Sequence, residues 1–250
     1  MKSIERHRIK EDQFVATLHE TFDRIEQNRK QVLTLGVALV VLAMAVGGFL
    51  WWRQQTLARA SALLADAMAV AEAPVTPPPP PPGSTLDPNT PIPPANSYAN
   101  ERARAAAALP KFLAAADAYP STLPGLAARY HAATTLAALG RDAEAEQRYQ
   151  EVIARAGSGL YGRVARLGIA EVQARQKKYE PAINTLKELS TTAKDDLPLD
   201  GVLMQLGRTY ALAGRKAEAV QAYERITTEF PSSVYAGDAR KEIDALKTGA

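Results

Sequence analysis

The chain contains one run of 22 residues without a charged side chain, residues 31–52. An α-helix of that length is ~33 Å long, enough to cross a hydrocarbon core of roughly 30 Å. Trp51 and Trp52 close the run at its C-terminal end, where amphipathic rings favour the membrane interface. Because the core helix of a soluble protein rarely runs this far without a charge, residues 31–52 are predicted to form a single transmembrane helix.

The charges that flank this run are unequal. Residues 1–30 contain seven Lys or Arg, whereas residues 53–82 contain only Arg53 and Arg59. The positive-inside rule therefore predicts a cytoplasmic N-terminus and a C-terminal region on the other side of the membrane. A cleaved signal peptide is the main alternative, but it has a short basic leader and an apolar region of only about 7–15 residues.

Residues 1–30 are predicted to be an amphipathic cytoplasmic leader, because apolar side chains recur on one helical face at Phe14, Leu18, Phe22 and Ile25. This leader could rest on the membrane or on a partner, or it could be a solvated extension of the membrane helix. Within the membrane run, Gly36, Ala43 and Gly47 form a strip of small residues. Such strips allow a neighbouring helix to approach closely.

The overall composition excludes several classes of function. Thirty Lys and Arg against 27 Asp and Glu give a formal net charge of +3, too balanced to indicate a nucleic-acid-binding face. The absence of cysteine excludes disulfides, Cys-ligated metals and thiol catalysis. His7, His19 and His131 lie too far apart for a local metal motif, so no metal or cofactor is expected. A chain rich in Ala, Leu, Arg and Glu favours helix over strand.

Four segments of the C-terminal region repeat at an interval of 37 residues. A small residue stands at the centre of each, followed four residues later by a large apolar residue and three residues after that by another apolar residue. The small residues are Ala108, Ala145, Ala182 and Ala219; the large ones are Phe112, Tyr149, Leu186 and Tyr223; the last set is Ala115, Val152, Leu189 and Ile226. These offsets describe one face of a helix that packs closely on a partner helix.

The last copy also contains the preceding helix, with Leu203, Leu206, Gly207 and Tyr210 on one face. Gly214 is expected to end that helix and Pro231 to end the next one. This pattern resembles the tetratricopeptide repeat, although the usual leading Trp is missing, the period is 37 rather than 34, and Lys177 replaces the turn glycine in the third copy. The resemblance implies an all-α fold: one N-terminal transmembrane helix followed by a tetratricopeptide-repeat-like α-solenoid.

The first copy is divided by a proline-rich tract that contains eleven of the 17 prolines. Residues 53–73 are predicted to form the first repeat helix, residues 74–97 an exposed insertion, and residues 98–250 the remaining helical repeats. Six consecutive prolines favour polyproline II and exclude helix. The insertion could dock into an aromatic-lined groove or serve as a spacer loop.

The sequence contains no catalytic motif in the structural context that such a motif needs. Residues 157–162 fit the dinucleotide pattern GxGxxG, but a helical segment precedes them where that motif needs a strand. Patterns for a nucleophile elbow, a zinc protease, a P-loop and an EF-hand do not occur. The sequence therefore predicts a protein that is not an enzyme.

The first helices of such an array are expected to line its concave side. Repeat-equivalent positions there form two rows, an apolar row of Tyr130, Leu167 and Met204 and a polar row of Thr134, Glu171 and Arg208. Together they would suit an extended or helical peptide. The alternative is that the apolar row belongs to the core between helices.

A cytoplasmic N-terminus, one membrane helix ending in aromatics and a repeat domain beyond it resemble the YfgM-type ancillary subunits of the SecYEG translocon. The segments YPSTLPGLAARY and FPSSVYAGDARKEIDAL also resemble repeat junctions of CpoB-type cell-division coordinators and outer-membrane assembly lipoproteins. The first resemblance implies an inner-membrane protein with a periplasmic domain. Its partners would be translocon subunits, periplasmic chaperones or secreted chains, with no nucleic acid and no small-molecule substrate. An anchored scaffold for envelope or division complexes is the alternative.

Overall fold

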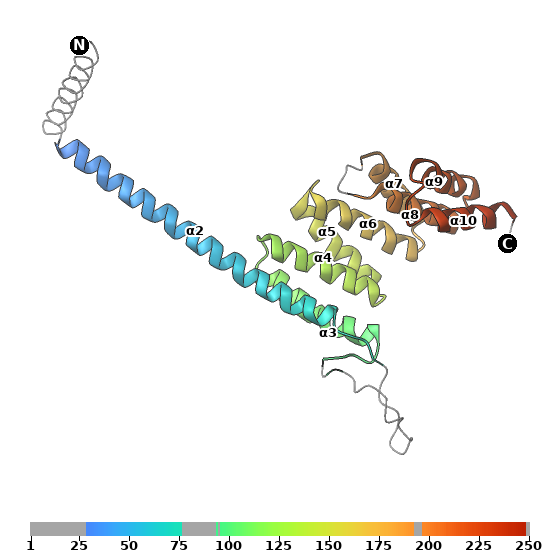
Figure 1. Ribbon diagram of the computed structural model, residues 1–250, viewed down its shortest axis with the longest axis horizontal. Helices are drawn as coiled ribbons and strands as arrows, with labels where there is room; N and C mark the ends of the chain where they lie inside the picture. The colour runs from blue at the N-terminus through green and yellow to red at the C-terminus, as the bar shows by residue number, and fades with distance from the viewer. Residues whose placement is uncertain (1–28, 77–93, 95, 193–196, 249–250) are drawn as a thin grey trace, which may run out of the picture. The chain divides into compact units, whose positions relative to one another are not determined.

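The computed structural model describes residues 29–76, 94, 96–192 and 197–248. Apart from turns and one isolated bridge, these residues are α-helical, which confirms the expected all-α class (Figure 1). The helices are α2 (Arg29–Ala71), α3 (Glu101–Ala118), α4 (Leu123–Ala138), α5 (Asp142–Ala156), α6 (Leu160–Arg175), α7 (Tyr179–Thr192), α8 (Leu199–Leu212), α9 (Lys216–Glu229) and α10 (Ala236–Thr248). The chain divides into two units, Met1–Thr56 and Leu57–Ala250, which are described separately.

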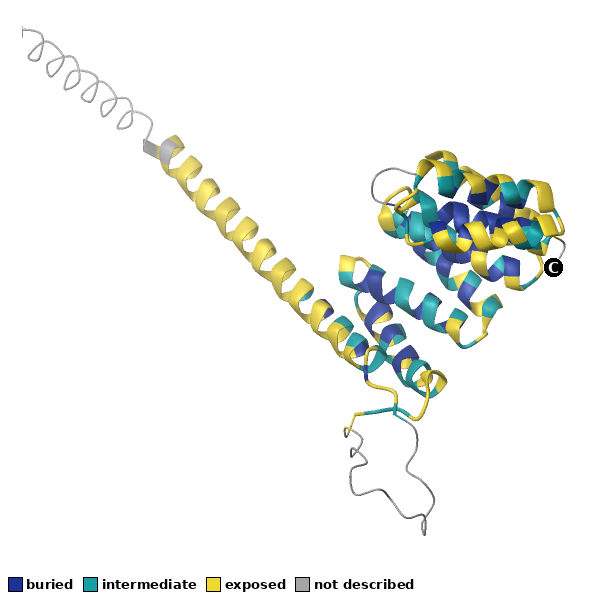
Figure 2. Cartoon of the chain, turned by 45° about the vertical axis from the view of Figure 1, so that its right-hand side comes forward, coloured by how far each residue is buried: buried dark blue, intermediate teal, exposed yellow. Residues whose placement is uncertain are grey.

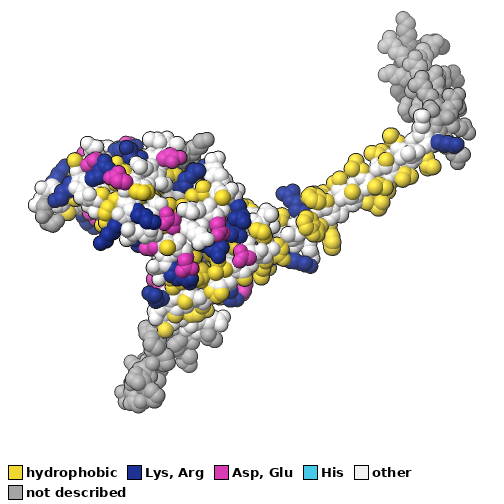
Figure 3. Space-filling model, turned by 180° about the vertical axis from the view of Figure 1, so that it is seen from behind, with side chains coloured by type: hydrophobic (Ala, Val, Ile, Leu, Met, Phe, Trp, Pro, Cys, Tyr) yellow, Lys and Arg dark blue, Asp and Glu magenta, His cyan; other side chains and the backbone are white. Residues whose placement is uncertain are grey.

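The described part of the first unit is the N-terminal portion of α2. Its apolar side chains are exposed on the sides of the helix that Figure 3 presents, and among the described residues α2 is the one helix long and apolar enough to cross a membrane. The hydroxyl of Thr34 donates to the carbonyl of Lys30 at 2.6 Å, and that of Thr56 donates to Trp52 at 2.9 Å. Both hydroxyls are therefore satisfied within the helix.

The helices of the second unit follow one another as antiparallel neighbours. Connections of three residues join α4 to α5, α5 to α6, α6 to α7 and α8 to α9, and from α3 onward each helix contacts the next along the chain. Connections this short require that consecutive helices run antiparallel and lie next to each other. In addition, α4 contacts α6 and α6 contacts α8, so the first helices of successive repeats lie side by side.

The turn inside each of three repeats has the same backbone geometry. Gly140, Lys177 and Gly214 stand 37 residues apart and have φ values of 78°, 61° and 76°. In the last of these turns, the Gly214 N–H donates to Ala211 and the Arg215 N–H donates to Tyr210, which is the Schellman pattern. Lys177 adopts this left-handed conformation although it has a side chain, so the third turn forms in spite of its sequence.

The repeated positions form the core of the second unit. All twelve residues identified by the 37-residue period are buried, none more than 3% exposed. Gly207 shows why the preceding helix needs a small residue: a Cβ built on it would lie 2.4 Å from Cε1 of Tyr223. The small residues thus permit backbones to approach the large side chains of the neighbouring helix.

Buried residues, dark blue in Figure 2, form two main clusters in the second unit. One extends from Ala67 through α3, α4 and α5, and the other joins α7, α8, α9 and α10. Helix α6 contributes to both, with Ala165 and Val172 in the first cluster and Ala170 and Ala174 in the second. The last helix, α10, covers the end of the second cluster with Ala239 and Ile243 and carries charged residues on its exposed side.

The C-terminal portion of α2 pairs with α3 across the proline-rich insertion. Asp66 forms an ion pair with Lys111, and Arg104 Nη1 donates to the carbonyl of Ala73 at 3.1 Å. A parallel bridge between Val75 and Tyr98 joins the two ends of the insertion. Most of the insertion, residues 77–93 and 95, lies outside the described residues, as do residues 1–28 of the predicted leader.

Candidate protein-binding surface

The two rows expected on the first helices differ in their exposure. Met204 is buried in the core of the C-terminal repeats at 2% exposure, and Leu167 is partly buried against the same core. Tyr130 is partly buried against the other core. The structure therefore places Met204 inside the protein, where the alternative interpretation put the whole apolar row, while Tyr130 and Leu167 keep part of their surface exposed.

The polar row remains at the surface. Glu171 and Arg208 are exposed and Thr134 is half-buried, its hydroxyl donating to the carbonyl of His131 at 2.9 Å. Glu171 accepts from Arg175 at 2.7 Å, so its charge is already paired. Arg208 makes no ion pair with any described residue. We define the first-helix face as Tyr130, Thr134, Leu167, Glu171 and Arg208.

Tyr130 belongs to an aromatic cluster that joins successive repeats. Its ring centroid lies 5.6 Å from that of His131, 6.0 Å from Tyr149 and 5.9 Å from Tyr161, and His131 stacks on Phe112 at 5.3 Å. Edge-to-face and tilted arrangements at these separations are favourable. The sequence indicated Tyr130 but not Tyr161, because Tyr161 begins the next repeat and no pattern within one repeat relates the two residues.

Burial shifts the pKa of two residues in this cluster, Tyr130 and His131. Burial and the charge of Glu171 raise the pKa of Tyr130, and burial lowers the pKa of His131 against the opposing charge of Glu72. At neutral pH the phenol of Tyr130 therefore keeps its proton and can donate a hydrogen bond. The first-helix face thus combines a partly exposed aromatic donor with the unpaired cation of Arg208.

The small residues of the first unit are also accessible. Gly36, Ala43 and Gly47 are exposed, and a Cβ built on Gly36 or Gly47 meets no atom within 4 Å. A helix from another chain could approach this strip closely. Its use as a contact site stays a prediction.

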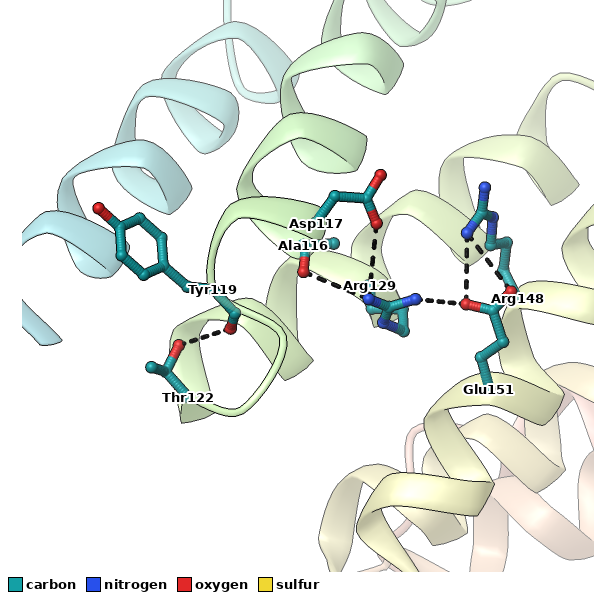
Figure 4. Close-up of polar contacts among 7 residues, drawn as sticks. All are labelled: Ala116, Asp117, Tyr119, Thr122, Arg129, Arg148 and Glu151. Carbon is teal, nitrogen blue, oxygen red and sulfur yellow. Dashed lines mark hydrogen bonds and ion pairs between the residues drawn. The ribbon is translucent and has the colours of Figure 1, made fainter. Parts of the chain in front are cut away.

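A buried arginine that the sequence did not indicate joins three helices (Figure 4). Arg129 of α4 is 5% exposed; its Nη2 donates to the carbonyl of Ala116 at 3.2 Å and lies 3.6 Å from Asp117 on α3, while Nη1 pairs with Glu151 on α5. Glu151 also accepts from Arg148 at 3.2 Å. Arg129 stands four residues before the small Ala133, at the repeat position where the leading Trp is missing. This offset is the sequence signal that could have indicated that Arg129 is buried.

Within the described ranges, no group of three or more His, Asp or Glu side chains is arranged to hold a metal ion. The GxGxxG segment, residues 157–162, forms the connection from α5 to α6 and the first turn of α6. Gly162 approaches the carbonyl of Gly157 so closely that a Cβ would lie 2.0 Å from its oxygen. These glycines therefore serve a tight connection between helices.

Comparison with known proteins agrees with this architecture. Residues 25–246 match the family described as the tetratricopeptide repeat-like domain. Among solved structures, a putative kinesin light chain of Podosopora anserina with nearly identical TPR-like repeats, and a single-substitution form of it, are each 13% identical to this chain. Each alignment covers 58% of this chain and 86% of the other, with a TM-score of 0.47. None of the curated proteins matches the sequence. Because the family match spans most of its length, the chain belongs to the tetratricopeptide repeat-like domain family.

Proposed function

We propose that this protein is a single-pass membrane protein whose repeat domain binds other proteins through the first-helix face. The family is one of protein–protein interaction modules and is typically non-enzymatic, so the function requires binding and no chemical step. The observation that carries the proposal is that Glu171, whose charge acts on the partly exposed Tyr130, and Arg208, one repeat further on, are both exposed. Arg208 has no ion-pair partner among the described residues, so a bound chain could provide one.

The chain would be an accessory of the Sec translocon in the inner membrane, with its repeat domain in the periplasm. Two features support this interpretation: the excess of Lys and Arg before the apolar run, and the resemblance to YfgM-type subunits. Gly36, Ala43 and Gly47 would contact a translocon helix. Tyr130, Thr134, Leu167, Glu171 and Arg208 would hold a secreted chain or a periplasmic chaperone.

Site-specific photo-crosslinking of the full-length protein in cells tests both contacts. A photoreactive residue is placed at Gly36, at Thr134 or at Arg208, with Lys187, exposed on the second-helix side of α7, as the matched control. We expect translocon subunits to be captured from Gly36, and secreted chains or chaperones from Thr134 and Arg208. Lys187 should capture neither.

Two results would contradict the proposal. Capture of cell-wall or division proteins alone, through the repeats, would make the protein an anchored scaffold for envelope complexes. Capture from Lys187 equal to that from Arg208 would show that the first-helix face is not the binding site. Glu171→Lys and Arg208→Glu variants provide a second check, because a charge-dependent contact should weaken with either while both variants remain folded.

A further inference from the structure

The connections between the helices of the second unit lie at two opposite edges of the helix stack. Leu57, the first residue of this unit, lies at one of these edges. Asp66 pairs with Lys111 and Ala73 with Arg104, an antiparallel register that places Leu57 opposite Pro120. The α3–α4 connection therefore lies at the same edge as Leu57. Because the helices then alternate in direction, the α5–α6 connection lies there as well (Figure 1). We call this the Leu57 edge.

Two exposed leucines occupy equivalent positions of successive repeats at the Leu57 edge. Leu123 and Leu160, 37 residues apart, are the first residues of α4 and α6 and are 65% and 47% exposed. The connections before them, residues 119–122 and 157–159, contain no charged residue. At the opposite edge, the turns carry cationic side chains: Arg141, Lys177, Lys178 and Arg215. The first two connections of the Leu57 edge are thus uncharged, whereas the turns of the opposite edge are cationic, although the same repeats build both.

A hollow of about 380 Å³ opens beside Leu123 at this edge. Its lining comprises Pro120, Ser121, Thr122, Leu123, Leu126 and Arg155. Arg155 is exposed at the end of α5 and makes no ion pair with any described residue. Apolar side chains, hydroxyls and an unpaired guanidinium therefore lie together on one surface.

We propose that the Leu57 edge rests on the surface of the bilayer, with Leu123 and Leu160 in the interfacial region and Arg155 on lipid phosphates. The inference rests on the proposed membrane anchor, because only four residues separate Trp52 from Leu57 and so hold this edge within reach of the lipid. Leucine gains by burial at the acyl boundary, and arginine can keep its charge among the headgroups. The α7–α8 connection contains Lys194, Asp195 and Asp196, so we assign the contact to the α3–α4 and α5–α6 connections, the two that follow Leu57 first along the chain.

The natural sequence has no cysteine, so single labels can be placed without background. Full-length Leu123→Cys, Leu160→Cys and Leu212→Cys variants carry an environment-sensitive fluorophore and are reconstituted into vesicles of phosphatidylethanolamine and phosphatidylglycerol. Leu212, 61% exposed near the opposite edge, is the matched control. Lipids brominated near the headgroup should quench the labels at residues 123 and 160 several-fold more than the label at 212, since interfacial segments lie roughly 5–10 Å deep.

A fourth label, at Val40→Cys near the middle of the apolar run, is probed with lipids brominated deep in their acyl chains and separates this inference from the proposed anchor. Quenching of residue 40 without quenching of residues 123 and 160 would overturn the bilayer contact and leave the anchor intact. An unquenched label at residue 40 would overturn both. Labels at residues 123 and 160 that are shielded from aqueous iodide but not quenched by lipid would assign the Leu57 edge to a protein partner instead, and would also overturn the proposal.

Discussion

Gly207 of α8 lies directly beneath the ring of Tyr223 on α9, close enough that any side chain at residue 207 must displace the ring. Gly207→Ala is expected to lower the free energy of unfolding by about 1–3 kcal/mol, because overpacking a filled core forces its neighbours to move. Gly201→Ala in the same helix is the control, because a Cβ built on Gly201 would lie 3.6 Å from Cε2 of Tyr235, an ordinary van der Waals distance. It should be neutral or stabilise by roughly 0.5–1 kcal/mol. Urea denaturation of the two variants makes the comparison, and an equal response to both would contradict the close approach.

The third turn is the one that a substitution should improve. Lys177→Gly removes a side chain from a residue at φ 61°, so it should raise the free energy of unfolding by about 1 kcal/mol. Gly214→Ala places a Cβ at φ 76° in the equivalent turn and should lower it by a similar amount. Thermal unfolding followed by circular dichroism measures both shifts. A destabilised Lys177→Gly variant would mean that the lysine side chain makes a contact that outweighs its strain.

Arg129 and Arg148 meet the same carboxylate with different burial. Arg129→Met keeps the volume but leaves Glu151 and the carbonyl of Ala116 without their buried donor, and should destabilise by about 2–3 kcal/mol. Arg148→Met removes a half-exposed partner of Glu151 and should cost less than about 1 kcal/mol. Chemical denaturation distinguishes these values. Equal losses would assign the effect to Glu151 alone.

Glu146 predicts a pH dependence of stability. Burial opposes its ionisation, but hydrogen bonds from Gln173, Lys178 and Gln176 outweigh burial and lower its pKa. A carboxyl with a lowered pKa in the folded state stabilises above its unfolded pKa, near 4.5, and loses this contribution as the pH falls through the folded value. Glu146→Gln should therefore melt below wild type at pH 7, and the difference should narrow below about pH 4. A difference that stays the same at low pH would contradict this assignment to Glu146.

The pinned ends of the proline-rich insertion predict that it can be shortened. The Thr76 N–H donates to the carbonyl of Tyr98 and the Tyr98 N–H donates to the carbonyl of Pro74, so backbone hydrogen bonds already hold the two ends of the insertion together. Replacing residues 77–95 with four glycine and serine residues should raise the free energy of unfolding by about 1 kcal/mol, because a shorter loop costs less entropy to close. Differential scanning calorimetry measures the change. Loss of the cooperative transition would show that the insertion supports the fold.

The sequence predicted those parts of the structure that depend on a single helix face. Ala145, Tyr149 and Val152 are buried as their spacing required, because periodicity within one helix determines which side meets its partner. It did not predict that Arg129 is buried or that Tyr161 lies against Tyr130, since both depend on how neighbouring repeats meet. The burial of Met204 has the same cause. The repeat pattern places this residue on a first helix, but how the following helices pack against it determines whether it is exposed.

Helix α6 gives its opposite sides to two different groups of buried residues, with Ala165 toward one and Ala170 toward the other. In a linear array each repeat contacts only its neighbours. Partial unfolding therefore moves along the chain as a boundary between folded and unfolded repeats. If unfolding stops at α6, one face of that helix becomes exposed to solvent while the other face keeps its packing contacts. Amide hydrogens of α6 should therefore exchange only as slowly as the less stable half of the array permits, and this helix sets how far a disturbance at one end travels toward the other.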